Sequence, residues 1–259
     1  MASSAPTDLP PLYRDLEPIQ RQKHGDMKFH RIDTIESLAT THAVPLTVDE
    51  FVLAQRQYPI IFSAGENPVP LALMALHEQT NTFFDSEGKP REDTVYIPAY
   101  IRRYPFMLAR LHPESDQLSL CVDPTAGAVG DFKDGAPLFD GDNPAEDTNE
   151  ILKFCEQFEQ AAQRTNAFMQ ELQGYDLLMD GELTISTGED SPPSVYRGFQ
   201  MIDEEKFRAL SGDKLRKMNQ SGILPLVMAH LMSLSLSRDL FARHMAQGTG
   251  PQPLAPAEA

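Results

Sequence analysis

Three short stretches of the chain carry residue types that bind metal ions, but none completes a ligand set. Residues 77–81 begin like a zinc-binding helix, yet Asn81 stands where the second histidine would have to lie, one helical turn after the first. Residues 112–114, His-Pro-Glu, match half of an iron-binding triad and equally form a good turn. The acidic residues 140–143 fail the spacing of a calcium-binding EF-hand loop. We therefore expect neither a metal nor another cofactor.

Other catalytic arrangements are also incomplete. The glycine-containing stretch 125–130 lacks the Lys-Ser/Thr ending of a phosphate-binding loop, and the chain has no Gly-x-Ser-x-Gly nucleophile motif. His230 lies between Val227 and Leu231 in an apolar helical pattern, which favours a hydrogen-bonded core imidazole over a catalytic base. The catalytic residues, if the chain has any, stay unknown at this stage.

The stretch 96–108 is the densest in residues that bind partners and ligands. Its thirteen residues include three Tyr, one Phe, two Pro and two Arg. Tyr and Arg combine a large apolar surface with a polar end and are enriched at interfaces. Together with His230, the candidate ligand- or partner-binding residues are therefore Tyr96, Tyr100, Arg102, Arg103, Tyr104 and Phe106. The alternative is that this stretch crosses the core and that nearby acids neutralise its arginines.

Arg102 and Arg103 are predicted to have different roles because they are adjacent. Neighbouring side chains diverge by about 100° on a helix and by about 180° on a strand, so the two guanidinium groups cannot share a direction. We expect one arginine to point inward and pair with a carboxylate, and the other to remain available to a partner. The sequence does not say which is which.

Composition limits the classes of partner. The 259 residues carry a net charge of −16, with an isoelectric point near 4.8, which repels phosphate backbones and anionic lipids. Nucleic acids and membrane surfaces are therefore disfavoured, whereas a cationic partner fits. We see no secretory signal and no apolar run long enough to span a membrane, so we expect a cytoplasmic location. Cys121 and Cys155 lie in apolar patterns and are expected to be reduced core residues.

The first half of the chain predicts mainly antiparallel β-structure. A capping box at residues 47–50 precedes a short helix. Apolar runs bounded by turn residues predict strands at 60–62, 71–76, 82–84, 95–97, 106–111 and 117–122. Residues 123–148 are rich in Asp and Gly and predict a long surface loop, anchored by Leu138 and Phe139.

The second half predicts mainly helices. Apolar residues recur every three or four positions over 150–172, and Gly174 closes this helix. Two strands are expected at 183–186 and 195–202. Asp203 and Ser211 are predicted helix N-caps, and a further helix follows Gly222 and ends near residue 245.

These elements predict an α+β fold, in which a β-rich N-terminal half packs with a helical C-terminal half in one core. The β-rich part covers residues 28–143 and the helical part covers 144–247, together forming a single domain. Residues 1–27 are expected to form a disordered or irregular arm, and residues 248–259 a disordered tail, because both are polar, contain proline and lack apolar periodicity.

Several segments in a fixed order resemble the SapC-like family of bacterial proteins, from about residue 44 to residue 246. They are residues 58–62, 70–73, 96–106, 137–139, 150–172, 177–178, 201–206, 221–224 and 229–234. The resemblance implies a gene neighbourhood of surface-layer secretion systems, outer-membrane receptors and flavin-dependent halogenase-like enzymes. It implies no agreed reaction and no cofactor.

We therefore predict a non-catalytic accessory or binding protein of a bacterial surface-protein, secretion or outer-membrane uptake pathway. It would recognise a protein partner, with a small anionic ligand left open, through the stretch 96–106. The alternative is an enzyme of unknown reaction in which Arg102 and Arg103 clamp an anionic substrate near Tyr100 and His230. A third possibility is a structural subunit. The sequence does not predict the oligomeric state.

Overall fold

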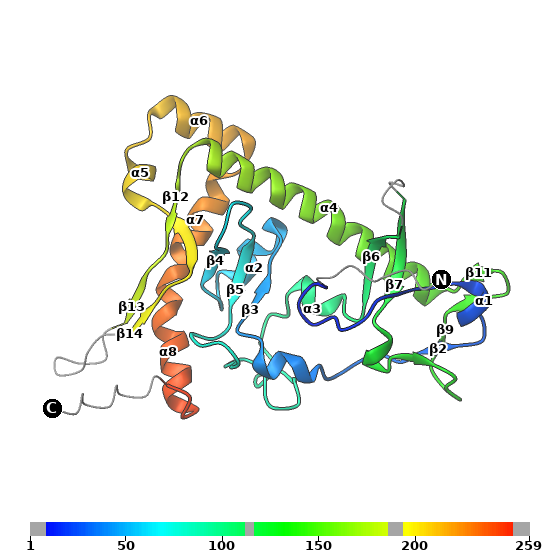
Figure 1. Ribbon diagram of the computed structural model, residues 1–259. Coiled ribbons are helices and arrows are strands. Elements are labelled where there is room, and N and C mark those ends of the chain that lie inside the picture. The colour runs from blue at the N-terminus through cyan, green and yellow to red at the C-terminus, as the bar shows by residue number, and fades with distance from the viewer. Residues whose placement is uncertain (1–8, 112–116, 186–193, 251–259) are drawn as a thin grey trace. The chain divides into compact units, whose positions relative to one another are not determined.

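The computed structural model describes residues 9–111, 117–185 and 194–250 (Figure 1). It confirms the α+β class, with antiparallel sheets and several helices. Its contacts group the chain into two compact units: unit 1 is Met1–Ile35 with Ile97–Arg164, and unit 2 is Glu36–Tyr96 with Thr165–Ala259. Each unit takes segments from both predicted halves, so the units do not coincide with a β-rich half and a helical half. The predicted limits of arm, domain and tail stay a prediction.

The described residues of unit 1 form two three-stranded antiparallel sheets and one pair of strands. In the first, β7 (Leu118–Val122) lies between β1 (Glu17–Pro18) and β6 (Phe106–Arg110). In the second, β2 (Lys28–Phe29) lies between β8 (Val129–Gly130) and β9 (Ala136–Pro137). The remaining elements are α1 (Arg21–His24), α3 (Ala99–Arg102), η3 (Pro124–Ala126), the pair β10 (Phe139–Asp140) and β11 (Asn143–Pro144), and the first part of α4 (Glu146–Gly174).

The core of unit 1 joins the first sheet to α4. Phe106 and Val122 on the strands pack with Cys155 on the helix, and all three are buried. Residues 9–27, predicted as a disordered or irregular arm, contribute β1 and α1 and bury Tyr13 and His24. The Tyr13 hydroxyl donates to the Phe106 carbonyl at 2.8 Å and β1 pairs with β7, and both contacts fix this segment to the unit despite its polar composition.

Unit 2 is built on a five-stranded antiparallel sheet. Its strands lie in the order β12 (Leu178–Asp180), β15 (Phe199–Ile202), β4 (Ile60–Ser63), β5 (Pro70–Leu73) and β3 (Ala43–Pro45). A separate pair is β13 (Leu183–Ile185) with β14 (Ser194–Tyr196). The helical elements are η1 (Glu36–Thr40), η2 (Val48–Glu50), α2 (Phe51–Ala54), α5 (Glu204–Arg208), α6 (Gly212–Ser221), α7 (Leu224–Ser233), η4 (Leu234–Leu236) and α8 (Ser237–Ala246).

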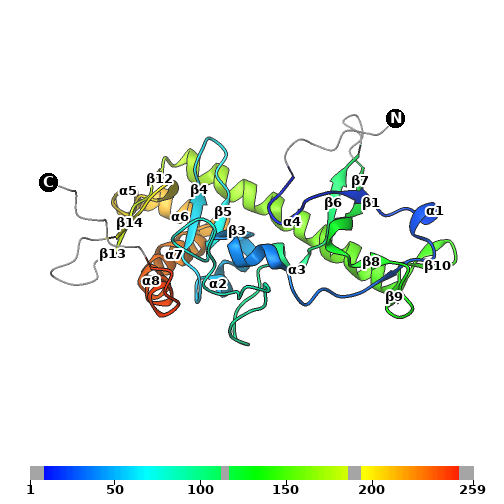
Figure 2. The same ribbon diagram turned by 60° about the horizontal axis from the view of Figure 1, so that its bottom comes forward.

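The helix α7 covers part of this sheet. It lies beside β4 and β15 in both views (Figures 1 and 2). The strand β4 begins with two β-branched residues, Ile60 and Ile61, which together with Phe62 are fully buried. Among the described residues, no single helix is long and apolar enough to cross a membrane; only α6 joined to the α7–α8 segment, with a 95° bend between them, has the required length and composition.

Local sequence signals are confirmed in detail. Thr47 and Glu50 form the predicted capping box, and Asp203 and Ser211 accept hydrogen bonds at the N-termini of α5 and α6. Gly222 closes α6 with a φ of 82°, a left-handed conformation that glycine adopts without strain. The helix predicted over 150–172 is α4 and extends from Glu146 to Gly174.

Three strand predictions are wrong. Residues 82–84 form no strand, and Phe84 makes only an isolated bridge with Pro90. Residues 95–97 form no strand, because side chains occupy the backbone of Tyr96: its N–H donates to Gln57 Oε1 at 2.6 Å, and its carbonyl accepts from the Tyr58 hydroxyl at 2.6 Å. The strand predicted over 195–202 is broken into β14 and β15 at Gly198, which has a φ of 90°. Residues 112–114, considered above for iron, lie outside the described residues.

Candidate functional site

The predicted binding stretch is mostly internal. In unit 1, Tyr100, Phe106 and Arg103 are 2%, 3% and 7% exposed. Tyr104 is half-buried and Arg102 is exposed. The alternative of a core crossing therefore describes most of this stretch, and Arg102 is the candidate residue whose side chain is open to a partner.

Arg103 is the inward arginine of the pair. Its guanidinium carbon lies 4.0 Å from the ring centre of Phe158, 4.8 Å from that of Tyr100 and 5.8 Å from that of Tyr13. One of its terminal nitrogens lies 3.5 Å from Glu159 Oε1. The pKa of Glu159 is raised, because burial outweighs the attraction of Arg103. Arg103 is thus held by aromatic rings and by one weak ion pair.

The tyrosines around Arg103 are donors to the backbone. The Tyr13 hydroxyl donates to the Phe106 carbonyl at 2.8 Å, and the Tyr100 hydroxyl donates to the Pro11 carbonyl. Burial raises the pKa of Tyr100 to about 12 and raises that of Tyr13 further. Both phenols therefore keep their protons at neutral pH, and their contacts fix residues 11–13 to the stretch instead of presenting an acid or a base.

Arg102 points away from this cluster. Its guanidinium carbon lies 5.3 Å from the ring centre of Phe154 on α4, a distance typical of an exposed cation–π contact. The expected division between an inward and an outward arginine is thus present, and the structure assigns the inward role to Arg103. Whether Arg102 binds a partner stays a prediction.

His230 in unit 2 is a buried hydrogen-bond acceptor. Its Nε2 accepts the backbone N–H of Ile202 at 3.1 Å, and its ring stacks on Phe62 with 4.6 Å between ring centres. Burial lowers its pKa to about 3, so the ring is neutral at physiological pH. In the described part of the chain, its Nδ1 makes no hydrogen bond of good geometry, although the backbone of Ile60 favours the protonated form. His230 is thus the core histidine favoured from sequence.

Ser233 completes the attachment of α7 to the sheet. Its Oγ accepts the backbone N–H of Ile60 at 2.9 Å and donates to the carbonyl of His230 at 2.7 Å. The backbone donors of Ile60 on β4 and Ile202 on β15 are thus satisfied by side chains of α7. An unsatisfied buried N–H costs about 1–3 kcal/mol, so these two side chains stabilise the packing of α7.

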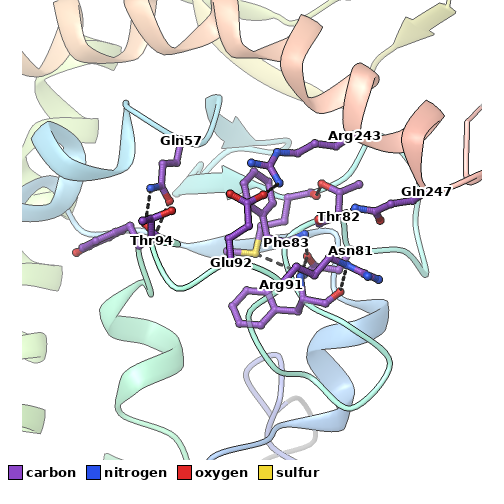
Figure 3. A network of polar contacts seen from close by, with 12 residues as sticks. Gln57, Asn81, Thr82, Phe83, Arg91, Glu92, Thr94, Arg243 and Gln247 are labelled. Atoms are coloured by element: carbon purple, nitrogen blue, oxygen red, sulfur yellow. Dashed lines mark hydrogen bonds and ion pairs between the residues drawn. The ribbon is translucent and has the colours of Figure 1, made fainter.

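A small cleft opens on unit 2 where three separate segments meet. It measures about 110 Å³ and is lined by Arg56, Gln57, Glu92, Val95, Leu236, Asp239 and Arg243. Arg243, on α8, donates to Glu92 Oε1 at 2.8 Å, and its guanidinium carbon lies 4.5 Å from the ring centre of Phe83 (Figure 3). We call this the Arg243 cleft. Gln57 donates to the Thr94 carbonyl at 2.7 Å and so fixes its opposite wall.

The Arg243 cleft was missed from sequence. The residues of its wall come from positions 56–57, 92–95 and 236–243, which carry no shared motif. Asn81 was singled out from the sequence and contributes to the cleft. It accepts the N–H groups of Phe83 and Phe84 at 2.9 and 3.1 Å and thereby shapes the loop that carries Phe83. The same Asn81 was read above only as the residue that breaks a zinc motif.

The chain matches a model of a known protein family over most of its length. The model described as SapC matches residues 19–240. The chain belongs to the SapC family. No curated protein and no solved structure gives a significant match. The SapC match covers the stretch 96–106, which contains the buried Arg103. It also covers residues 229–234, which contain His230 and Ser233, the two residues that attach α7 to the sheet.

The seven candidate residues of this SapC chain do not form one site within a unit. Tyr96 and His230 belong to unit 2, and the other five belong to unit 1. The Tyr96 hydroxyl donates to Glu50 Oε1 at 2.9 Å, which ties it to the capping box of η2. Among the described residues there is no group of three or more His, Cys, Asp or Glu placed to hold a metal ion.

The cysteines of this SapC chain are free and buried, as predicted. Burial raises the pKa of Cys121 to about 11 and that of Cys155 to about 12. At neutral pH both thiols are therefore protonated, and neither is suited to act as a nucleophile.

The SapC chain also exposes an apolar surface beside the Arg243 cleft. The helices α2 and α7 contact each other and expose Val52, Leu53, Met228 and Met232, which are 54%, 47%, 36% and 61% exposed. Leu236 of the cleft follows Met232 by four residues and Arg56 follows Leu53 by three, about one helical turn in each case. The apolar side chains, here called the α7 surface, therefore adjoin the cleft.

Proposed function

We propose that this SapC protein is a non-catalytic accessory protein of a bacterial surface-protein, secretion or outer-membrane uptake pathway, and that it binds a protein partner. The observation that carries the proposal is the α7 surface beside the Arg243 cleft. Methionine is flexible and polarisable, and exposed methionines are common on surfaces that bind protein segments. Grouped exposed apolar side chains that adjoin polar ones are typical of interaction sites.

The size of the Arg243 cleft supports a protein partner over a substrate. Pockets that bind small molecules usually measure about 300–1,000 Å³. At about 110 Å³, the cleft has room for one side chain. It offers hydrogen-bonding and charged groups at its wall, among them Arg56 and Asp239, while the α7 surface offers apolar area. Such a pairing of an apolar contact and one anchored polar side chain is typical of protein interfaces.

The enzyme alternative draws no support from the contacts of its proposed residues. Nε2 of His230 is occupied by the Ile202 N–H, and burial keeps the ring neutral. Arg103 is enclosed by three aromatic rings and paired with Glu159, so its positive charge already has partners. An anion clamp needs accessible donors, and of the two arginines only Arg102 is exposed.

The proposal is tested by affinity capture with the full chain as bait in a native lysate. Met228→Gln/Met232→Gln replaces two apolar side chains by polar ones of similar length and helix propensity. Met245→Gln is the matched control, since Met245 is 58% exposed and points about 200° away from Arg243 on α8. We expect the wild type and the control to retain the same protein and the double variant to lose it. Equal retention by all three baits contradicts the proposed surface.

A further inference from the structure

The end of α8 is attached to the rest of unit 2 through an imidazole that must be neutral. His244 is fully buried, and its Nε2 lies 2.8 Å from the backbone nitrogen of Leu76. Because the Leu76 N–H is a donor, Nε2 must carry a lone pair. The ring proton therefore lies on Nδ1, which donates to Thr249 Oγ1 at 2.9 Å. A second proton on the ring would make Nε2 a donor, and it would then face the Leu76 N–H, which is also a donor.

The attachment of α7 uses the same chemistry but has more support. His230 accepts the Ile202 N–H, while Ser233 accepts the Ile60 N–H, and the His230 ring stacks on Phe62. The last turn of α8 is held by His244 together with two contacts nearer the solvent, Arg243 with Glu92 and Gln247 with the Thr82 carbonyl. A helix end held by few buried contacts opens at lower free energy than a helix covered along its length.

We propose that His244 is an acid-sensitive latch: uptake of a proton by its ring breaks the bond to Leu76 and releases the end of α8, while His230 keeps α7 on the sheet. The proposal follows from a comparison of two buried acceptors, Nε2 of His230 and Nε2 of His244. Other buried contacts hold α7 on the sheet, whereas the end of α8 has few. Its expected operating range is mildly acidic, below the ordinary pKa of histidine near 6.5.

The surroundings of the His244 and His230 rings both favour the neutral imidazole in the closed state. The ring of His77 lies 5.2 Å from that of His244, and its Nε2 is buried without a hydrogen-bond partner among the described residues. Burial, and after it the neighbouring His77, lower the pKa of His244. For His230, burial alone lowers the pKa to about 3, and no charged side chain of the described residues is a cause of the shift.

The sign of the pH effect follows from the lowered pKa. A base whose pKa falls on folding binds a proton more tightly in the open state than in the closed state, so protonation favours opening. The stabilisation by the latch is therefore complete above about pH 6.5 and is lost as the pH falls below that value. An open His244 with an ordinary pKa gives an opening equilibrium about tenfold larger at pH 5.5 than at pH 7.5.

Opening of the latch would dismantle the Arg243 cleft. Asp239 and Arg243 line the cleft and lie on the same helix as His244, so release of the end of α8 draws Arg243 away from Glu92. A partner that needs the intact cleft would then bind more weakly in mild acid, by at most about tenfold. This second step rests on the proposed function, whereas the latch itself does not.

The experiment measures amide protection in the full chain by NMR between pH 7.5 and 5.5, corrected for intrinsic exchange. We expect the protection of the Leu76 amide to fall about tenfold over this range, while that of the Ile202 amide changes less than about twofold. In His244→Gln the amide oxygen accepts from Leu76 without titrating, so the fall at Leu76 should disappear. His30→Gln, at a half-exposed histidine of unit 1, should behave as the wild type.

The latch is overturned if Leu76 keeps its protection in the wild type at pH 5.5, or if Ile202 loses protection in parallel with Leu76. A pH dependence that survives in His244→Gln overturns it as well. The wild-type comparison of the two amides decides the matter even where a variant does not fold. A normal latch with no change in partner binding between pH 7.5 and 5.5 would contradict the coupling of the latch to the cleft and leave the latch standing, whereas a failure of the proposed function would show as no binding at either pH.

Discussion

Two arginines, one in each unit, have the same kinds of partner and differ in burial. Arg103 lies 4.0 Å from the ring centre of Phe158 and 3.5 Å from Glu159, and the side chain is 6% exposed. Arg243 lies 4.5 Å from the ring centre of Phe83 and 2.8 Å from Glu92, and the side chain is 31% exposed. Both are an arginine over an aromatic ring with a glutamate beside it.

The difference in burial gives Arg103 and Arg243 different roles. A charge removed from water needs its partners, and the loss of one partner leaves the other uncompensated at a cost of about 3–5 kcal/mol. An ion pair near the surface contributes about 0–1 kcal/mol, because water can replace either partner. We therefore interpret Arg103 as a structural residue of unit 1, and propose Arg243 as a group that a partner can reach.

The largest expected effect follows from removal of Arg103. Arg103→Ala removes the contacts with three aromatic rings and opens a cavity between Phe158 and Tyr100, so we expect a loss of about 2–5 kcal/mol in the free energy of unfolding. Urea denaturation at pH 7 measures it. A loss below about 1 kcal/mol would show that the contacts of Arg103 with the surrounding aromatic rings do not stabilise unit 1.

The second effect concerns the attachment of α7. Ser233→Ala leaves the Ile60 N–H without its acceptor and should lower the free energy of unfolding by about 1–3 kcal/mol. Ser235→Ala is a matched control, because Ser235 is exposed and makes the same local hydrogen bond, to the Met232 carbonyl at 2.8 Å. It should change stability by less than about 0.5 kcal/mol. Equal losses in both variants would mean that the bond to Ile60 contributes nothing particular.

Arg243→Ala should affect partner binding more than stability, the opposite of what we expect for Arg103→Ala. Its side chain is 31% exposed and its ion pair with Glu92 is near the surface, so we expect a loss of stability below about 1 kcal/mol. If the cleft anchors a partner, the same variant should weaken binding about tenfold, which corresponds to about 1.4 kcal/mol. Unfolding curves and titration of the partner provide both values. A large loss of stability with unchanged binding would assign Arg243 to the core instead.

The smallest expected effect belongs to Arg102. Arg102→Ala removes an exposed side chain over Phe154 and should change the free energy of unfolding by less than about 0.5 kcal/mol. Measured beside Arg103→Ala, it is the strictest test of the division between the two adjacent arginines. Similar losses of stability in both variants would contradict that division.

The sequence was sufficient where neighbours along the chain decide the structure. The capping box of Thr47 and Glu50, the caps Asp203 and Ser211, and the apolar period of α4 are local patterns, and each was recognised. The inward direction of one arginine was also predictable, because adjacent side chains diverge.

The sequence was insufficient where distant segments decide the structure. Residues 95–97 look like a strand, but Gln57 and Tyr58 occupy the backbone of Tyr96 across 39 and 38 positions of sequence. The choice of Arg103 over Arg102 depends on Tyr13 and Phe158, which the sequence places far away. The Arg243 cleft joins three segments and had no local signature.

The central claim is that a protein partner binds at the α7 surface and the Arg243 cleft. The most direct test is the affinity of the captured partner for the wild type, Met232→Gln and Arg103→Ala, measured at a temperature at which all three are folded. We predict that Met232→Gln weakens binding about tenfold or more and that Arg103→Ala binds as the wild type does. Unchanged binding by Met232→Gln together with weakened binding by folded Arg103→Ala would contradict this account, and would place recognition in the stretch 96–106.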